Sequence, residues 1–270
     1  MINLNFTNKN KVVLGIFCFL ILFIYGQSLL GDFVFDDRGI MEHVETLSNV
    51  DNLGKVAMHP YWDLGAGLYR PTTLLSYSFN LIIFGKDPFS FHLINLALYI
   101  FICFFIYLLI KKLFSDSILA FITSLLFLVL PIHTEVVANI TGRSELLCLF
   151  FALLAMLEST KDKINPYFLF LWTLLSIGSK ETGLALIPVL AMLFYYKEEN
   201  LNIDIIKKYF REISATTLGV LLYFTLRFLV LSVPKFLNIN TSLIENPLMF
   251  ADTPSRIFTE IGRASCRERV

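Results

Sequence analysis

Charged residues are scarce in this sequence: Asp, Glu, Lys and Arg make up 16% of its 270 residues, whereas hydrophobic residues make up 56%. A soluble globular domain carries about 25% charged residues. The composition therefore excludes that class and indicates a multi-spanning protein whose main partner is the lipid bilayer. The formal net charge is zero, and we expect no nucleic-acid partner.

Cysteine is equally sparse, with four residues in the whole chain. Cys18, Cys103 and Cys148 lie inside apolar runs, where a thiol behaves as a small hydrophobic group. This placement excludes a disulfide framework and a cysteine-type metal site. The sequence also lacks the internal repeats that are typical of many transporters.

Seven apolar runs predict an all-α, polytopic membrane protein with about seven membrane helices. The runs are residues 12–30, 91–110, 118–130, 146–157, 168–177, 184–196 and 215–233. A span needs about 20 residues, so polar residues that face other helices or a cavity must complete the shorter runs. Lys9 and Lys11 precede the first run, which predicts a cytoplasmic N-terminus. A signal peptide is disfavoured because the run is long and no cleavage site follows it.

Residues 1–259 are predicted to form one membrane domain whose first outer loop, residues 31–90, carries short helices on the membrane surface. Loops longer than about 12–15 residues are uncommon unless they are functional. Within this loop, residues 74–84 predict a half-apolar helix with Ser76, Ser78 and Asn80 on its polar face. Residues 260–270 differ abruptly in composition and resemble a translated sequencing adapter, so we expect a non-native tail and a natural chain that continues further.

The predicted topology gathers charges of both signs on the outer side of the membrane, whereas the inner loops carry mainly Lys. The outer residues are Asp36, Asp37, Arg70, His133, Glu135, Arg143, Lys180 and Glu181. Charge within the hydrocarbon costs about 2.5–3.5 kcal/mol per residue, so charges kept beside it indicate a functional site. A carboxylate there can act as a general base, and Arg or Lys can hold a phosphate. The cluster suits transfer of a group from a lipid-linked phosphate to a hydroxyl acceptor.

Asp36 and Asp37 follow the first apolar run directly. If this stretch is extended, the two side chains point to opposite faces, and only one aims into the site. The structural alternative is that the pair caps the next segment or marks the water interface.

Short motifs recur along the chain in a fixed order. They are Phe33-Val34-Phe35-Asp36-Asp37, Tyr69-Arg70-Pro71, Phe91-His92-Leu93-Ile94-Asn95, Pro131-Ile132-His133-Thr134-Glu135, Gly142-Arg143-Ser144-Glu145, Ser179-Lys180-Glu181-Thr182-Gly183 and Glu245-Asn246-Pro247-Leu248. Each motif is weak alone, but together they resemble the membrane half of the transmembrane and tetratricopeptide-repeat glycosyltransferases of the GT-C superfamily. The resemblance implies a GT-C-type helical bundle that moves a sugar, often mannose, from a polyprenyl phosphate to a protein or glycan. Inversion by one base is the implied stereochemistry.

The resemblance also implies roles for individual residues. Asp36 is expected to deprotonate the acceptor hydroxyl, and Asp37 to orient Asp36 or the sugar. Arg70 is expected to contact the phosphate. Substrate contacts are also expected of His133, Glu135, Arg143, Lys180 and Glu181. For Arg227 a contact with the lipid phosphate is expected from its charge within an apolar run, and not from the resemblance.

Each of these residues has a structural alternative. His133 and Glu135 form too small a set for a metal site, and Glu135 near a helix start suits the helix dipole. We therefore expect no metal site in the sequence, and dependence on a divalent metal stays open. Lys180 and Glu181 suit an internal ion pair.

Arginine at a helix end commonly extends to the interface, which is the alternative for Arg143. Arg227 lies within the last apolar run, where it can pair with an acid. His92 and Asn95 open the second span, and we favour helix packing for both.

Two other functions remain open, a non-catalytic scaffold and a transporter. A transporter predicts polar residues at mid-depth in the spans, and a scaffold predicts that Asp36→Asn has no effect. The tetratricopeptide repeats and the last membrane helices of the family are absent from this sequence, so the fragment itself need not be active.

The abundance of Ile, Phe, Asn and Lys, together with a terse first loop, favours a prokaryotic cytoplasmic membrane with the site facing outward. The endoplasmic reticulum membrane is the alternative.

Overall fold

The computed structural model describes residues 8–61, 67–198 and 207–232, all within one compact unit. These ranges contain helices and connecting turns and no β-strand, which confirms the all-α prediction. Our predictions for the motif at 245–248 and for the tail at 260–270 lie outside the described residues.

Each of the seven apolar runs forms a helix. They are α1 (Asn8–Tyr25), α6 (Pro88–Phe114), α7 (Ser117–Val129), α9 (Arg143–Ser159), α10 (Pro166–Ser179), α11 (Leu186–Glu198) and α13 (Phe210–Leu231). Four helical segments of the described chain are long and apolar enough to cross a membrane, and α7 with the bent continuation Pro131–Ala138 makes a fifth. α10 and α11, with 14 and 13 residues, are shorter than a full span. The chain is therefore a polytopic membrane protein.

The starts of three long helices follow from local sequence. Asp87, Asp116 and Asn165 each accept a hydrogen bond from a backbone N–H in the first turn of α6, α7 and α10 respectively. Such caps satisfy donors that have no partner within the helix. α6 and α10 also begin with proline, which has no N–H to leave unpaired and a backbone angle suited to a first turn.

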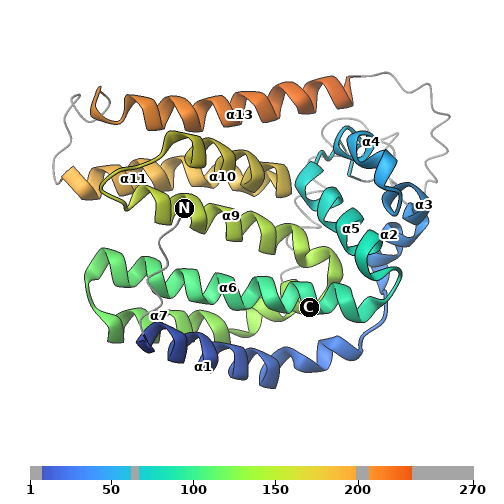
Figure 1. The fold of residues 1–270 in the computed structure, drawn as a ribbon, viewed down its shortest axis with the longest axis horizontal. Coiled ribbons are helices and arrows are strands. Elements are labelled where there is room, and N and C mark those ends of the chain that lie inside the picture. Colours follow the sequence, from blue (N-terminus) through green and yellow to red (C-terminus); the bar gives the residue numbers. More distant parts are fainter. Residues whose placement is uncertain (1–7, 62–66, 199–206, 233–270) are drawn as a thin grey trace, which may run out of the picture. The chain divides into compact units, whose positions relative to one another are not determined.

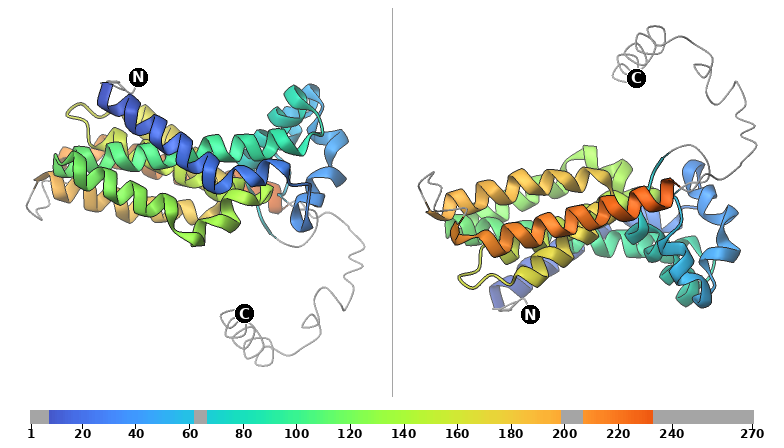
Figure 2. Two further views of the ribbon diagram at one scale, coloured as in Figure 1. Left: turned by 90° about the horizontal axis from the view of Figure 1, so that it is seen from below. Right: turned by 90° about the horizontal axis from the view of Figure 1, so that it is seen from above.

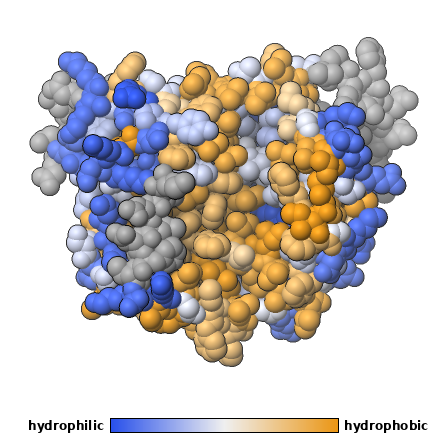
Figure 3. All heavy atoms as spheres, in the orientation of Figure 1, coloured by the Kyte–Doolittle hydropathy of each residue, from blue (hydrophilic) through white to orange (hydrophobic). Residues whose placement is uncertain are grey.

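The long helices run side by side, as Figures 1 and 2 show from three directions. α9 packs between α6 and α10, α13 packs on α10, and α1 and α7 pack on α6. Apolar residues cover the middle of the visible face and hydrophilic residues gather at both of its ends (Figure 3). This banding is what a bilayer requires of helices that cross it.

One end of the helices carries Lys111 and Lys197, and we call it the lysine end. Lys111 at the end of α6 donates to Asn10 at the start of α1, with 3.1 Å between Nζ and Oδ1. Lys197 at the end of α11 donates to the carbonyls of Ser159 and Lys161, just after α9. The helix ends that were predicted to face the cytoplasm thus lie together.

The first outer loop folds into short helices at the opposite end (Figure 1). These are α2 (Arg38–Glu42), α3 (Val44–Leu47), α4 (Leu53–Ala57) and α5 (Pro71–Phe84). The prediction of a water-facing polar side on α5 is wrong, because Ser78 and Asn80 are fully buried. α5 turns this side toward the protein because Asn80 binds a buried arginine on α9, Arg143, described below.

Gly142 stands at a close approach between two segments. A Cβ atom at this position would lie 2.1 Å from the carbonyl oxygen of Val136, in the short helix α8 (Thr134–Ala138). No side chain fits there without moving the backbone. This contact sets where α9 begins relative to the loop before it.

Gly142→Ala should therefore destabilise the protein, by about 3 kcal/mol, the upper end for overpacking in a closely packed site. Thermal unfolding of the detergent-solubilised chain would measure the change. Gly15→Ala is the matched control, because a Cβ at Gly15 meets no atom within 4 Å. Equal loss of stability in both variants would contradict the prediction.

Candidate functional site

A cavity of about 290 Å³ opens at the end of the helices opposite Lys111 and Lys197. Three of the predicted site residues, Asp36, Arg70 and Glu135, line it together. Its other lining residues are Tyr61, Val136, Asn139, Thr141, Gly142, Ser144 and Glu145. We call it the polar cavity. The structure thus brings together residues from the first outer loop, α8 and α9.

Asp36 and Asp37 have separate positions, as predicted, although they lie in a 3₁₀ turn (Phe35–Asp37) and not in an extended segment. Asp36 is exposed and lines the polar cavity. Asp37 is fully buried and accepts hydrogen bonds from the backbone N–H of Thr141, at 2.9 Å, and of Val34, at 3.3 Å. Asp37 therefore anchors the turn that carries Asp36.

Burial raises the pKa of Asp37 above its usual range. The hydrogen bonds from Thr141 and Val34 favour the charged carboxylate and oppose this shift. The net effect is a buried acid that is more easily protonated than an exposed one.

Arg70 lies just before α5 and binds Glu181. Its Nε and one terminal nitrogen donate to the same carboxylate oxygen, at 3.0 and 2.9 Å. The guanidinium carbon also lies 4.9 Å from the centre of the Tyr61 ring. Thr73 on α5 donates to the Ser179 carbonyl at 2.9 Å, which brings the segment that carries Glu181 alongside Arg70.

Arg227 of α13 supports the same arrangement from the other side. Its guanidinium lies 3.4 Å from the second carboxylate oxygen of Glu181 and donates to the Gly67 carbonyl at 2.8 Å. On the same helix, Tyr223 donates to the Tyr69 carbonyl at 3.0 Å. α13 therefore fixes the segment that ends at Arg70. The alternative that Arg227 pairs with an acid is confirmed.

Lys180 and Glu181 do not pair with each other. Lys180 has an extended backbone, which directs the two side chains to opposite sides. Lys180 forms an ion pair with Glu145, and Glu181 binds Arg70. Two ion pairs thus flank the polar cavity, and each contributes one of its lining residues.

The charge of Glu181 is stabilised by its neighbours. Burial alone would raise its pKa, but a backbone N–H, the Arg70 guanidinium and the charge of Arg227 together hold it below the usual range. Glu181 is thus negatively charged at neutral pH.

Arg143 is fully buried, so the alternative of an arginine that reaches the interface is wrong. Its guanidinium donates to the Oδ1 atoms of Asn95 and Asn80, at 2.9 Å each, and to the Phe91 carbonyl at 2.8 Å. The Tyr77 and Phe91 rings each lie 5.1 Å from its central carbon. Arg143 joins α9 to α5 and α6, and its expected substrate contact stays a prediction.

His133 lies apart from Glu135 although only one residue separates them. Its ring packs on Phe127, with 4.2 Å between ring centres, and lines a second cavity of about 330 Å³. We call this the apolar cavity, since hydrophobic side chains from α6, α7, α9 and α11 form most of its wall. Val136 and Glu145 line both cavities.

Sequence reasoning missed seven of the ten residues that line the polar cavity, among them Glu145 and Tyr61. Glu145 belongs to a recognised motif, but an acid in the first turn of a helix is also explained by the helix dipole. Tyr61 belongs to none of the recognised motifs. The lining carboxylates among the described residues are Asp36, Glu135 and Glu145, and no three His, Cys, Asp or Glu side chains in these parts of the chain group as a metal site.

Arg143→Lys should lower the free energy of unfolding by about 3 kcal/mol, even though the charge is kept. A lysine ammonium cannot reproduce the planar fork that reaches three acceptors, and breaking a buried charged network costs about 3–5 kcal/mol. Chemical or thermal unfolding in detergent would measure the loss. Arg38→Lys, at an exposed position, should change stability little, and a similar loss there would count against the network.

Glu181→Gln should flatten the dependence of stability on pH. Because the folded protein holds the pKa of Glu181 below its unfolded value, the unfolded chain binds more protons between the two values, and stability rises with pH across that window. The stabilisation is present above the unfolded pKa and is lost as pH falls through the folded one. Unfolding midpoints between about pH 3 and pH 6 should therefore change more in the wild type than in Glu181→Gln, and parallel curves would contradict this.

The sequence is similar to those of known protein mannosyltransferases. Residues 71–202 match the family model described as dolichyl-phosphate-mannose-protein mannosyltransferase. Protein O-mannosyl-transferase TMTC1 of Homo sapiens is 32% identical over 188 residues, which cover 61% of this chain and 21% of that protein. Protein O-mannosyl-transferase TMTC3 of Homo sapiens is 35% identical over 155 residues, which cover 55% of this chain and 17% of that protein.

A Caenorhabditis elegans protein O-mannosyl-transferase is 35% identical over 175 residues, which cover 61% of this chain and 25% of that protein. The chain thus spans about a fifth of the length of these relatives. No solved structure matches it significantly. Over residues 71–202 the chain is similar to the dolichyl-phosphate-mannose-protein mannosyltransferase family, and the resemblance that its motifs indicate is confirmed.

Proposed function

We propose that the polar cavity is the site where a mannosyl group passes from a polyprenyl phosphate to a hydroxyl group of a protein. One observation carries this proposal: a cavity lined by carboxylates and an arginine adjoins an apolar cavity, and the two share Val136 and Glu145. A lipid-linked phosphate sugar needs such a pair of surfaces. Its isoprenoid chain requires an apolar wall, and its charged head requires polar groups.

In the proposed reaction the Asp36 carboxylate takes the proton of the acceptor hydroxyl. The hydroxyl oxygen then forms a bond to the anomeric carbon while the bond from that carbon to the phosphate oxygen breaks. The phosphate leaves with the electron pair and gains a negative charge. Arg70 lies in the same cavity and can stabilise this charge with donors that Glu181 does not use. Displacement by one oxygen inverts the anomeric centre.

Asp36 is preferred as the base over the other two acids. Glu145 forms an ion pair with Lys180, so its carboxylate is already engaged and is less free to meet the acceptor hydroxyl. Glu135 is exposed and lines the cavity, so it is the second candidate. Asp36 is favoured because its turn is anchored through Asp37, and a fixed geometry is what general-base catalysis needs.

The remaining site residues receive less direct roles. Lys180 and Arg227 hold Glu145 and Glu181, and we assign them to positioning. His133 lines the apolar cavity, where we propose that it contacts the lipid near the phosphate. We place the protein in a cytoplasmic membrane with the lysine end inside and the polar cavity outside, and an endoplasmic reticulum membrane is the alternative.

Asp36→Asn should reduce mannosyl transfer by about 10²–10⁴-fold, the usual contribution of a general base. The protein would be expressed from its complete reading frame, and transfer of radiolabelled mannose from polyprenyl-phosphate mannose to protein would be measured in membranes. Asp32→Asn is the matched control, because Asp32 is an exposed acid in the same segment and does not line the cavity.

Three outcomes separate the alternatives. Loss of transfer in Asp36→Asn but not in Asp32→Asn supports the proposal. Wild-type transfer in Asp36→Asn, together with loss in Glu135→Gln, would move the base to Glu135. No transfer by the wild type with either mannose or glucose donors would favour a scaffold.

A further inference from the structure

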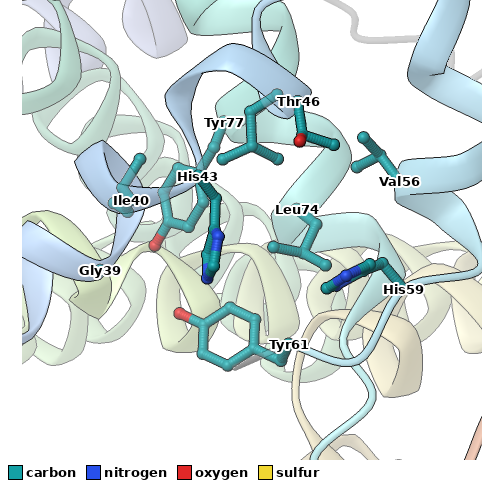
Figure 4. Close-up of a pocket in the computed structure, with 10 residues that line it drawn as sticks. Gly39, Ile40, His43, Thr46, Val56, His59, Tyr61, Leu74 and Tyr77 are labelled. Atoms are coloured by element: carbon teal, nitrogen blue, oxygen red, sulfur yellow. The ribbon is translucent and has the colours of Figure 1, made fainter. Parts of the chain in front are cut away.

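A third cavity lies among the short helices of the first outer loop, which the proposed reaction does not use. It has a volume of about 40 Å³ and is bounded by α2, α3, α4 and α5. His43 and His59 lie on either side of Leu74, and the Tyr61 ring lies beneath them (Figure 4). We call it the small outer cavity.

Tyr61 is the wall between this cavity and the polar cavity, since it lines both. The residue is buried, with 3% of its surface exposed. Its backbone N–H donates to the Leu68 carbonyl at 2.9 Å, and the Arg70 guanidinium packs near its ring. The wall is therefore held in place from the backbone and from the side chain.

We propose that the small outer cavity binds one side chain of the acceptor polypeptide while the hydroxyl to be glycosylated lies beside Asp36. This inference rests on the proposed function and adds a specificity site to it. Asp36 and the cavity residue Ile40 belong to one short stretch, the turn at Phe35–Asp37 and the helix α2 that follows it. The base and the cavity are thus carried by the same anchored segment.

The size of the cavity limits which side chain it takes. A volume of about 40 Å³ holds about three water-sized groups, since one such group needs about 10–15 Å³ of this kind of volume. Val, Thr and Pro have side chains of three heavy atoms. Phe and Trp are too large. The wall of the cavity is mostly apolar and includes Ile40 and Leu74, which favours Val or Pro over charged residues.

Peptide geometry limits where that side chain lies in the acceptor sequence. In an extended chain, successive side chains point to opposite faces, and residues two positions apart face the same surface about 6.6 Å from each other. The two cavities share Tyr61 as a common wall. The proposal therefore places the specificity residue two positions from the accepting Ser or Thr, on the same face of an extended acceptor.

Thr46 offers a way to close the cavity without disturbing the core, because it lines the cavity and is exposed. Thr46→Phe should fill the entrance. Ser48→Phe is the matched control: it adds the same ring at another exposed position next to α3, outside the lining. Leu74→Ala is the converse variant, since it enlarges the cavity.

The test measures mannosyl transfer to synthetic peptides that each contain one Thr, with Val, Pro, Phe or Trp two positions before or after it. For the wild type, the kcat/KM of the best peptide with Val or Pro should be at least tenfold above that of the peptide with Trp at the same position. Thr46→Phe should raise the KM for the Val peptide about tenfold and leave kcat unchanged, whereas Ser48→Phe should change neither. Leu74→Ala should narrow the gap between the Val and Phe peptides.

Release of mannose to water from polyprenyl-phosphate mannose serves as the second readout, because it needs the donor site and no acceptor. It should be equal in the wild type, Thr46→Phe and Ser48→Phe. Equal use of all peptides by a wild type that transfers mannose overturns the acceptor site and leaves the proposed function standing. Neither transfer nor release by the wild type overturns both.

Discussion

The site depends on a buried positive charge. Arg143 begins α9, and its guanidinium is completely enclosed by acceptors from α5 and α6. A charge can remain in such a place only if its donors are matched, so the three helices meet in a single register. The next two residues, Ser144 and Glu145, line the polar cavity. The requirement to bind one guanidinium thus fixes the floor of the cavity relative to the outer loop.

The charges around the cavity fall into two groups with different physical roles. Arg70 with Glu181, and Lys180 with Glu145, form ion pairs that hold distant segments together. Asp36 and Glu135 are exposed acids that make no ion pair within the described parts of the chain. The paired charges fix the positions of the segments that carry them, while an acid that makes no ion pair is free to approach the acceptor hydroxyl, as base catalysis requires.

Sequence alone predicted the helices and three of the ten residues that line the polar cavity, Asp36, Arg70 and Glu135, because apolar runs and motif order depend on neighbouring residues. The sequence-based prediction failed where a residue distant in the sequence determines which side chains are buried. Asn80 and Ser78 suggest a polar surface in the sequence, but both are buried, and Asn80 accepts a hydrogen bond from Arg143. The separation of Asp36 from Asp37 was predicted from an extended strand, but a 3₁₀ turn and the N–H of Thr141 produce it. The small outer cavity arises from four short helices, and no local pattern indicates it.

The charged side chains around the polar cavity also matter for the negative charge that develops on the leaving phosphate in the proposed transfer. Acids and basic residues lie together in and around the polar cavity: Asp36, Asp37, Glu135, Glu145 and Glu181 with Arg70, Arg143, Lys180 and Arg227. When the phosphate leaves, it gains one negative charge, and in the same step Asp36 loses its own by accepting the hydroxyl proton. The net charge of the cavity then stays constant through the transfer. A base on the cavity wall is therefore better suited to this step than a base in bulk water, since only the former offsets the leaving group's charge where it develops.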